Sequence, residues 1–192
     1  MDLSAPGYET EKLRYEPLVE AHSVVLLDSE IAQSVWKYMP ALRHGTNLRN
    51  YFDFLLNVQI SGRSANYVLF RKADNQFVGL TGFSEINKIH RRLRNTIAWH
   101  PHELASEELY QAAQHGMLKR AYDWRAKRLE WQINPDNKFQ MQHVASLNPT
   151  REAHFRNYER TAGGDWIDKI VFSMTRPELA AAIQTLETRL IG

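Results

Sequence analysis

The hydrophobic spacing of this chain changes partway along it, and that change constrains the fold more than any other feature. Residues 19–38 and 48–60 carry apolar side chains three and four positions apart, which predicts two helices, the second capped by Thr46 or Asn47. Short runs typical of strands follow, at residues 67–71, 77–86 and 95–99. A further strand is predicted at residues 13–18, so two helices separate it from three consecutive strands.

The second half of the chain alternates between the two kinds of spacing. Residues 107–124 and 138–147 have helical patterns, and Pro177 can open a last helix that runs to Leu190. Strands are expected between them, at residues 128–133, 151–160 and 166–175, the last two as a hairpin. Strands outnumber what a doubly wound fold needs. We therefore expect an α/β (α+β) fold with one mixed, mostly antiparallel central sheet and helices on both faces.

The composition limits the functions that this chain can have. No repeat, low-complexity tract or long linker interrupts the 192 residues, so one domain covering residues 1–192 is expected. The formal net charge of +2 gives no reason to expect nucleic-acid binding, and no apolar run approaches the ~18 residues of a membrane span. Cysteine is absent, which excludes disulfides, a thiol nucleophile and thiolate zinc sites. The polar, acidic start does not resemble a signal peptide, so a cytoplasmic protein is expected.

Five short motifs follow one another between residues 79 and 174. They read GLTGF at 79–83, IAWHP at 97–101, RLEW at 128–131 with NPDN at 134–137, EAHFRNY at 152–158, and WIDKIVFSM at 166–174. Each motif alone is common, but their order and spacing together resemble the GNAT acetyltransferase superfamily. Within it, they are most similar to the branch that includes the RimJ/RimL-type N-terminal acetyltransferases. The resemblance covers residues 13–179.

The resemblance implies transfer of acetyl from acetyl-CoA to an amine, either a protein N-terminus or a small molecule, by direct attack of the amine. In this family the fourth and fifth strands splay apart and expose backbone groups that pair with the pantetheine arm, which places Trp99 beside the cofactor. The next helix directs its N-terminus at the pyrophosphate, here at Ala105 and Ser106. Asn137 matches a family asparagine, and it either contacts the cofactor or caps the following helix. Gln140 stands where the family often has a serine that acts as the acid.

The loop before this helix departs from the family pattern. The family has Q/R-x-x-G-x-G/A, whereas residues 102–108 read HELASEE, without glycine. Glycines let the backbone come close to the phosphates, and Glu107 and Glu108 would repel them. Ser106 is a good N-cap, so the segment is also typical of a stable helix start. Two functions therefore stay open: an acetyltransferase with a degenerate cofactor loop, and a catalytically inactive GNAT-fold binding or regulatory protein that has lost acetyl-CoA binding.

Glu85 and His100 are the candidates for the base that takes a proton from the acceptor amine, because both lie near ends of strands that flank the expected cleft. The family often has an acidic residue where this chain has Arg94. Residues 100–103 lack the spacing of a known metal site, so no metal is expected. The basic segment 90–94 could meet an acidic peptide, RNA or the CoA 3′-phosphate, or be a solvated turn. The acceptor is not identified by the sequence, and a homodimer or another protein partner stays open.

Overall fold

An eight-stranded sheet forms the centre of the molecule, in the order β1-β2-β3-β4-β5-β6-β8-β7. The computed structural model describes residues 7–27, 40–42, 47–99 and 106–191, with the backbone alone at 97–99. The strands are β1 (Tyr8–Glu9), β2 (Leu13–Pro17), β3 (Ala65–Arg71), β4 (Phe77–Asn87), β5 (Arg92–Trp99), β6 (Arg128–Ile133), β7 (Thr150–Arg160) and β8 (Trp166–Thr175). Neighbouring strands are antiparallel except β5 and β6, which are parallel. The expected mixed, mostly antiparallel sheet is confirmed.

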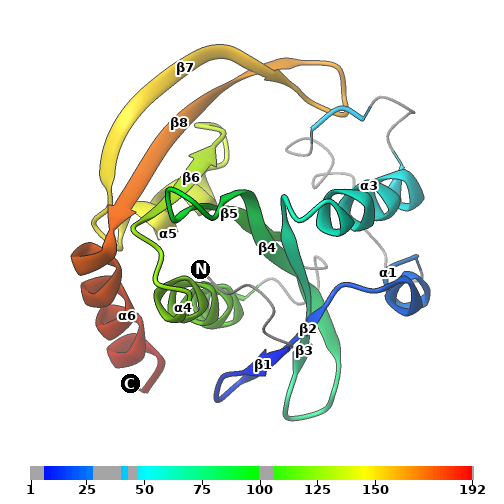
Figure 1. The fold of residues 1–192 in the computed structure, drawn as a ribbon, viewed down its shortest axis with the longest axis horizontal. Coiled ribbons are helices and arrows are strands. Elements are labelled where there is room, and N and C mark those ends of the chain that lie inside the picture. Colours follow the sequence, from blue (N-terminus) through cyan, green and yellow to red (C-terminus); the bar gives the residue numbers. More distant parts are fainter. Residues whose placement is uncertain (1–6, 28–39, 43–46, 100–105, 192) are drawn as a thin grey trace.

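Helices cover both faces of this sheet (Figure 1). In the described parts of the chain the helices are η1 (Glu20–His22), α1 (Ser23–Leu27), α3 (Leu48–Ile60), α4 (Glu107–Asp123), α5 (Lys138–Ala145) and α6 (Arg176–Ile191). α3 starts after Asn47, whose side chain accepts a hydrogen bond from the backbone N–H of Asn50 at 2.8 Å, so Asn47 is the cap. α1 and α3 pack on one face of the sheet, and α4, α5 and α6 pack on the other.

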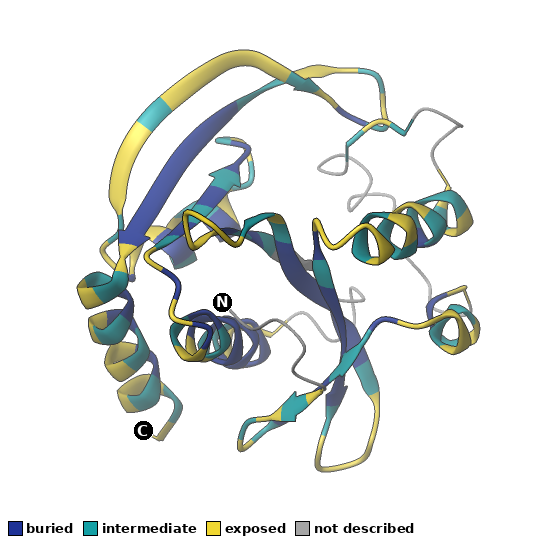
Figure 2. Ribbon diagram, viewed as in Figure 1, coloured by how far each residue is buried: buried dark blue, intermediate teal, exposed yellow. Residues whose placement is uncertain are grey.

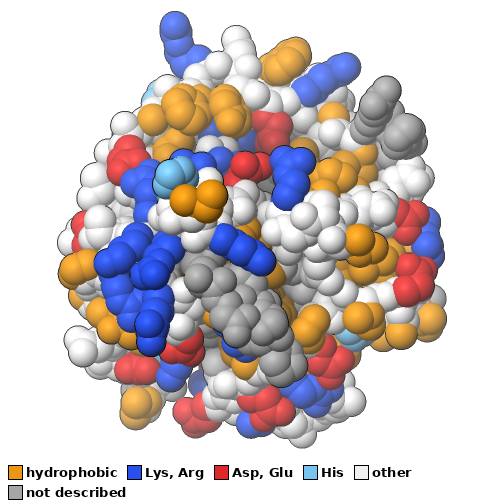
Figure 3. All heavy atoms as spheres, in the orientation of Figure 1, with side chains coloured by type: hydrophobic (Ala, Val, Ile, Leu, Met, Phe, Trp, Pro, Cys, Tyr) orange, Lys and Arg blue, Asp and Glu red, His pale blue; other side chains and the backbone are white. Residues whose placement is uncertain are grey.

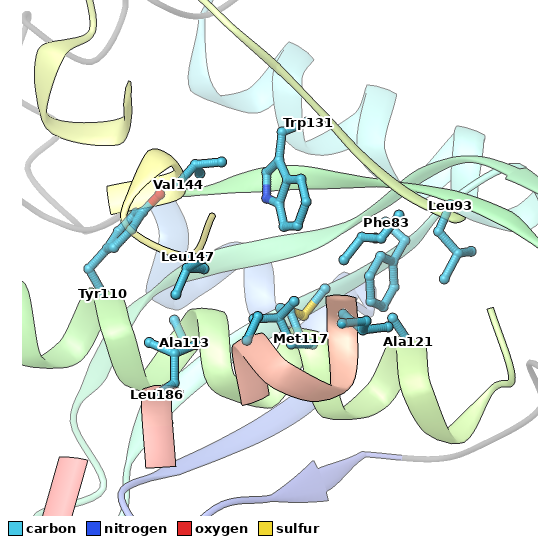
Figure 4. Packing of buried hydrophobic residues seen from close by; sticks show 14 of the residues in the cluster. Phe83, Leu93, Tyr110, Ala113, Met117, Ala121, Trp131, Val144, Leu147 and Leu186 are labelled. Atoms are coloured by element: carbon cyan, nitrogen blue, oxygen red, sulfur yellow. The ribbon is translucent and has the colours of Figure 1, made fainter. Parts of the chain in front are cut away.

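The larger hydrophobic core lies between one face of the sheet and the helices α4 and α6 that cover this face. Figure 4 shows Phe83, Leu93 and Trp131 from three neighbouring strands packed toward Met117 and Ala121 of α4. These five side chains are at most 1% exposed. A smaller core holds α1 and α3 against the other face; it consists of Leu18, Leu26, Phe52, Val68, Phe70 and Leu80. The sheet is thus held from both sides by apolar burial.

The hairpin of β7 and β8 arches away from the body of the sheet (Figure 1). β8 is largely buried along its second half, whereas β7 forms the exposed edge of the sheet (Figure 2). The tip of the hairpin is attached to a distant segment of the chain. Thr161 forms a β-bridge with Pro40, and the backbone N–H of Ala41 donates to the Arg160 carbonyl at 2.8 Å.

Most expected elements are confirmed to within a few residues, and two differences have physical reasons. β5 begins at Arg92, not at residue 95, because residues 92–94 pair with β6, and Arg92 and Arg94 pair with β4 as well, so that the strand includes two charged side chains. β1 was not expected, since only two residues pair with β2. The helix expected at 19–38 begins as η1 and α1, and its part from residue 28 on lies outside the described residues. No helix within the described ranges is long and apolar enough to cross a membrane.

Candidate functional site

β5 and β6 are joined along only a short stretch. Their paired residues are Arg92 with Arg128, Leu93 with Leu129, and Arg94 with Glu130. We call these three pairs the seam. Beyond the seam β5 continues to Trp99 and β6 to Ile133 without pairing to each other. At about 3.3 Å per residue, the unpaired part of β5 is roughly 16 Å long. We call this opening the splay; its edges carry backbone N–H and C=O groups that have no partner across it.

Two helices begin at the wide end of the splay. α4 follows the carboxyl end of β5, and α5 follows the carboxyl end of β6. The two helices are in contact, because the ring of Tyr110 lies 5.0 Å from that of Phe139 in the first turn of α5 and 4.8 Å from that of His143 in its last turn, centre to centre. Helix N-termini present unpaired N–H groups and a partial positive charge, so this end of the splay is suited to an anion.

The start of α4 is capped and carries two carboxylates. The side chain of Ser106 accepts a hydrogen bond from the backbone N–H of Leu109 at 3.1 Å. Glu108 forms an ion pair with Lys12 from the turn between β1 and β2, which lowers the pKa of Glu108. The carboxylate of Glu107 accepts from Gln111 Nε2 at 3.0 Å and lies 3.6 Å from His143 Nε2. The ion pair with Lys12 therefore compensates the charge of Glu108, which weakens the repulsion of phosphates that the sequence led us to expect.

The start of α5 combines a capped turn with an unsatisfied buried atom. The side chain of Asn137 accepts from the backbone N–H of Gln140 at 3.2 Å, so Asn137 is the N-cap. Gln140 is only 6% exposed, and its Oε1 is buried without a hydrogen-bond partner among the described residues. A buried acceptor of this kind costs stability unless a donor reaches it. Gln140 thus suits a ligand that brings an N–H or O–H group.

The face of β5 and β6 opposite α4 carries a polar network. Arg128 donates from Nη1 to Glu152 at 2.7 Å and from Nη2 to Glu130 at 3.2 Å. Ser173 Oγ donates to Glu152 at 2.7 Å, and Arg92 Nε lies 3.9 Å from Glu130. The hydrogen bonds from Arg128 and then Ser173 lower the pKa of Glu152 to about 2. We call this surface the polar face; it lies at the narrow end of the splay.

A separate group of cations lies at the amino end of β5. Arg91 of the β4–β5 turn and Arg125 and Lys127 of the α4–β6 loop are exposed, and the backbone N–H of Lys127 donates to the Arg91 carbonyl at 2.8 Å. Figure 3 shows Lys and Arg side chains gathered where α4 leads into β6. This turn is separated from the helix starts by the length of β5, roughly 23 Å at the usual rise. The start of the basic segment 90–94 is therefore not beside a phosphate at α4.

The structure brings most of the expected cofactor residues to one end of the sheet. Trp99 ends β5, and Ser106, Asn137 and Gln140 mark the two helix starts. Ala105 and His100 lie outside the described residues. Glu85 is exposed in β4, with a φ of 50°, at an irregularity in its pairing with β5. Glu85 therefore lies closer to the seam than to the helix starts.

The members of the polar face were not among the site residues expected from the sequence. Arg128 and Glu130 were noticed only as part of a motif, and Glu152 and Ser173 likewise. The signal was present in the alternation of residues 128–133, because the apolar face of that strand leaves Arg128, Glu130 and Gln132 together on the other side. The contribution of Glu152 depends on a pairing between distant segments, which a single sequence does not reveal.

Comparisons with family models and with curated protein sequences find no match. Solved structures do match over nearly the whole chain. A protein from T. thermophilus that is assigned as an acetyltransferase has a TM-score of 0.84 and 19% identity, and the match covers 99% of this chain and 100% of that one. Mycobacterium smegmatis RimJ, solved with CoA-disulfide, has a TM-score of 0.78 and 17% identity, with 92% and 88% covered.

Spermidine N-acetyltransferase from Vibrio cholerae, solved with CoA and spermine, has a TM-score of 0.74 and 11% identity, with 89% and 99% covered. Other matches are described as members of the GNAT family or as GCN5-related N-acetyltransferases. The chain therefore has the GNAT acetyltransferase fold, which confirms the fold expected from the five sequence motifs.

Proposed function

We propose that this protein is an N-acetyltransferase that moves acetyl from acetyl-CoA to a primary amine, either a protein N-terminus or a small molecule. The observation that carries this proposal is the splay between β5 and β6, whose wide end faces the first turns of α4 and α5. An extended arm with amide groups fits an open strand edge, and phosphates fit helix starts. Proteins of the same fold have been solved with CoA and with CoA-disulfide, which supports the proposal.

The residues at the splay fit the cofactor chemically. Backbone groups of β5 up to Trp99 would pair with the amides of pantetheine, and the unpartnered Oε1 of Gln140 would accept from a donor of the cofactor. Ser106 and Asn137 cap the helices whose free N–H groups would hold the pyrophosphate. Because Glu108 is paired with Lys12, the loop without glycine does not present two unpaired carboxylates to the phosphates.

For this reaction the protein needs to do little more than position the acceptor amine beside the thioester. The acceptor amine must be neutral to attack the thioester, so a base has to take its proton, and we assign that role to Glu85 or His100. Gln140 cannot transfer a proton usefully, so the departing thiolate would be protonated by solvent or stabilised by hydrogen bonds. Changing Glu85 or His100 separately to Gln should lower kcat/KM by at least about 100-fold for the true base and leave acetyl-CoA binding intact.

Isothermal titration with acetyl-CoA and with CoA tests the proposal directly. We expect saturable binding in the micromolar range. Replacing Glu107 and Glu108 together by Ala should strengthen that binding or leave it unchanged, because the replacement removes negative charge at the start of α4. Glu20→Ala, which removes an exposed carboxylate paired with Arg49 near α1, is the matched control and should not change the affinity.

Absence of any heat at millimolar ligand would contradict the proposal. The acidic first turn of α4 would then favour the second function, a GNAT-fold protein that binds a partner without catalysis. The search would move from acceptors to protein partners recovered with the intact chain.

A further inference from the structure

Arg94 occupies the last pair of the seam, opposite Glu130, where β5 and β6 begin to diverge. Its neighbours Leu93 and Asn95 face α4, since Leu93 belongs to the larger core and Asn95 Nδ2 donates to Gln114 Oε1 at 3.2 Å. Side chains alternate along a strand, so Arg94 lies on the polar face. The seam thus places a guanidinium at the narrow end of the splay.

This guanidinium has no counter-charge among the described residues. Arg94 is half-buried, its Nε is fully buried without a hydrogen-bond partner, and none of the ion pairs within the described ranges includes it. A buried donor without a partner costs free energy, and a half-buried cation without an anion costs more. A bound anion would offset this free-energy cost.

The other charges of the polar face are matched to one another. Arg128 and Arg92 meet the carboxylates of Glu130 and Glu152, so two arginines face two glutamates. Further along β8, Lys169 is paired with Glu159 at 2.6 Å. Among the residues that the structure describes, Arg94 is therefore the positive charge of the polar face that no carboxylate matches, and it is the group that an incoming anion would meet.

Arg94 is positioned to contact the acceptor, and it lies away from the expected cofactor phosphates. If the phosphates lie at the starts of α4 and α5, the extended arm of the cofactor runs from the wide end of the splay toward the seam. Its thioester end then comes to the level of Arg94 and Glu130. A group that approaches from the polar face at this level would be the acceptor amine together with its substituents.

We propose that Arg94 binds a carboxylate of the acceptor, so that the preferred substrates are primary amines that also carry a carboxylate. This inference rests on the proposed function. Two sources have the required chemistry: an acidic side chain at a peptide N-terminus, and the α-carboxylate of a free amino acid. A planar guanidinium can bind either in a two-pronged arrangement. Polyamines, which bring only positive charge, are poor substrates for this surface.

The test uses the intact chain, acetyl-CoA and two pairs of acceptors. The peptide amides Glu-Ala-Ala and Gln-Ala-Ala differ in a side-chain carboxylate, and free glutamine and glutamine amide differ in the α-carboxylate. We expect the charged member of one pair to have a kcat/KM at least tenfold higher, and the responding pair identifies the source. Arg94→Gln should reduce that ratio to about one while retaining acetyl-CoA affinity by titration. Arg125→Gln, an exposed arginine after α4, is the matched control and should keep the preference.

Each outcome has a distinct meaning. Acetyl-CoA binding without a preference for the charged acceptor in either pair overturns the inference and leaves the proposed function standing. A preference that survives Arg94→Gln also overturns it. Failure of the wild-type chain to bind acetyl-CoA overturns the proposed function, and the acceptor site with it. A thermal melt of Arg94→Gln at or above the wild-type temperature confirms that the variant is folded.

Discussion

The carboxylate of Glu152 depends on donors that come from two other strands. Arg128 of β6 and Ser173 of β8 both donate to it, and together they hold its pKa near 2, below the ordinary value of 4.5. A carboxyl group with a lowered pKa in the folded state stabilises the fold when it is ionised. The contribution of Glu152 to the free energy of unfolding is therefore complete above about pH 4.5 and is lost as the pH falls toward 2.

Glu152→Gln should accordingly lower the free energy of unfolding at pH 7 more than at pH 3. The physical reason is the loss of a charged acceptor that is present only above the lowered pKa. Urea denaturation of wild type and variant at pH 7, 5 and 3 measures the difference. Ser173→Ala removes one of the two donors and should show a smaller effect with the same pH dependence. A difference that does not change with pH would contradict this account.

Gly116 of α4 is in close contact with a buried tyrosine. The Oη of Tyr15, which is fully buried, donates to the Ala112 carbonyl at 2.9 Å, and its ring lies against Gly116. A Cβ at position 116 would overlap Oη and Cζ of Tyr15 and come within 2.9 Å of Cε2. Glycine at this position therefore lets the helix approach β2 closely.

Gly116→Ala should destabilise the protein by about 1–3 kcal/mol, because overpacking outweighs the better helix propensity of alanine. Chemical denaturation in urea measures the change. Gly163→Ala is the matched control, since the nearest heavy atom to its added Cβ lies 3.7 Å away, and it should change stability by at most about 0.5 kcal/mol. A Gly116→Ala variant as stable as the control would show that Tyr15 moves freely.

Among the helices and strands, α4 has the start whose role was hardest to predict from the sequence. Ser106 caps the helix, so Ser106→Ala should lower stability by about 1 kcal/mol, measured by thermal or urea unfolding. Ser61→Ala is a control at the C-terminal end of α3, where the hydroxyl donates to the Val58 carbonyl at 2.6 Å in an exposed turn, and it should have a smaller effect. Equal effects would mean that the cap of α4 is not the reason for the loss.

The elements were largely predictable because local patterns determined them. The alternation of β6 and the capping residues Asn47 and Ser106 depend on neighbours in the sequence, and all three were expected. The start of β5 was not, because Arg92 and Arg94 belong to a basic segment that becomes a strand only through pairing with β4 and β6. The ion pair of Glu108 with Lys12 joins residues far apart in the chain, so the sequence indicated a repulsive carboxylate where the structure has a compensated one.

At the scale of the whole molecule, ligand binding should raise stability. With acetyl-CoA at 100 times its dissociation constant, the folded state gains about 2.7 kcal/mol. For a chain of 192 residues this corresponds to a rise in Tm of about 5–11 °C. Differential scanning fluorimetry measures it. Pantetheine and adenosine 3′,5′-bisphosphate tested separately show which end of the cofactor is held, and a Tm unaffected by all three would contradict acetyl-CoA binding.

The seam has a mechanical consequence. Within the sheet as the described residues form it, three residue pairs connect the five strands from β1 to β5 with the three strands β6, β8 and β7. The two groups of strands could therefore move relative to each other about the seam. A cofactor bound in the splay would connect them along the rest of their length. Amide protons on the open edge of β5 should then exchange with solvent more slowly in the presence of acetyl-CoA. The bound ligand would then fill the gap between β5 and β6 and also take part in the reaction.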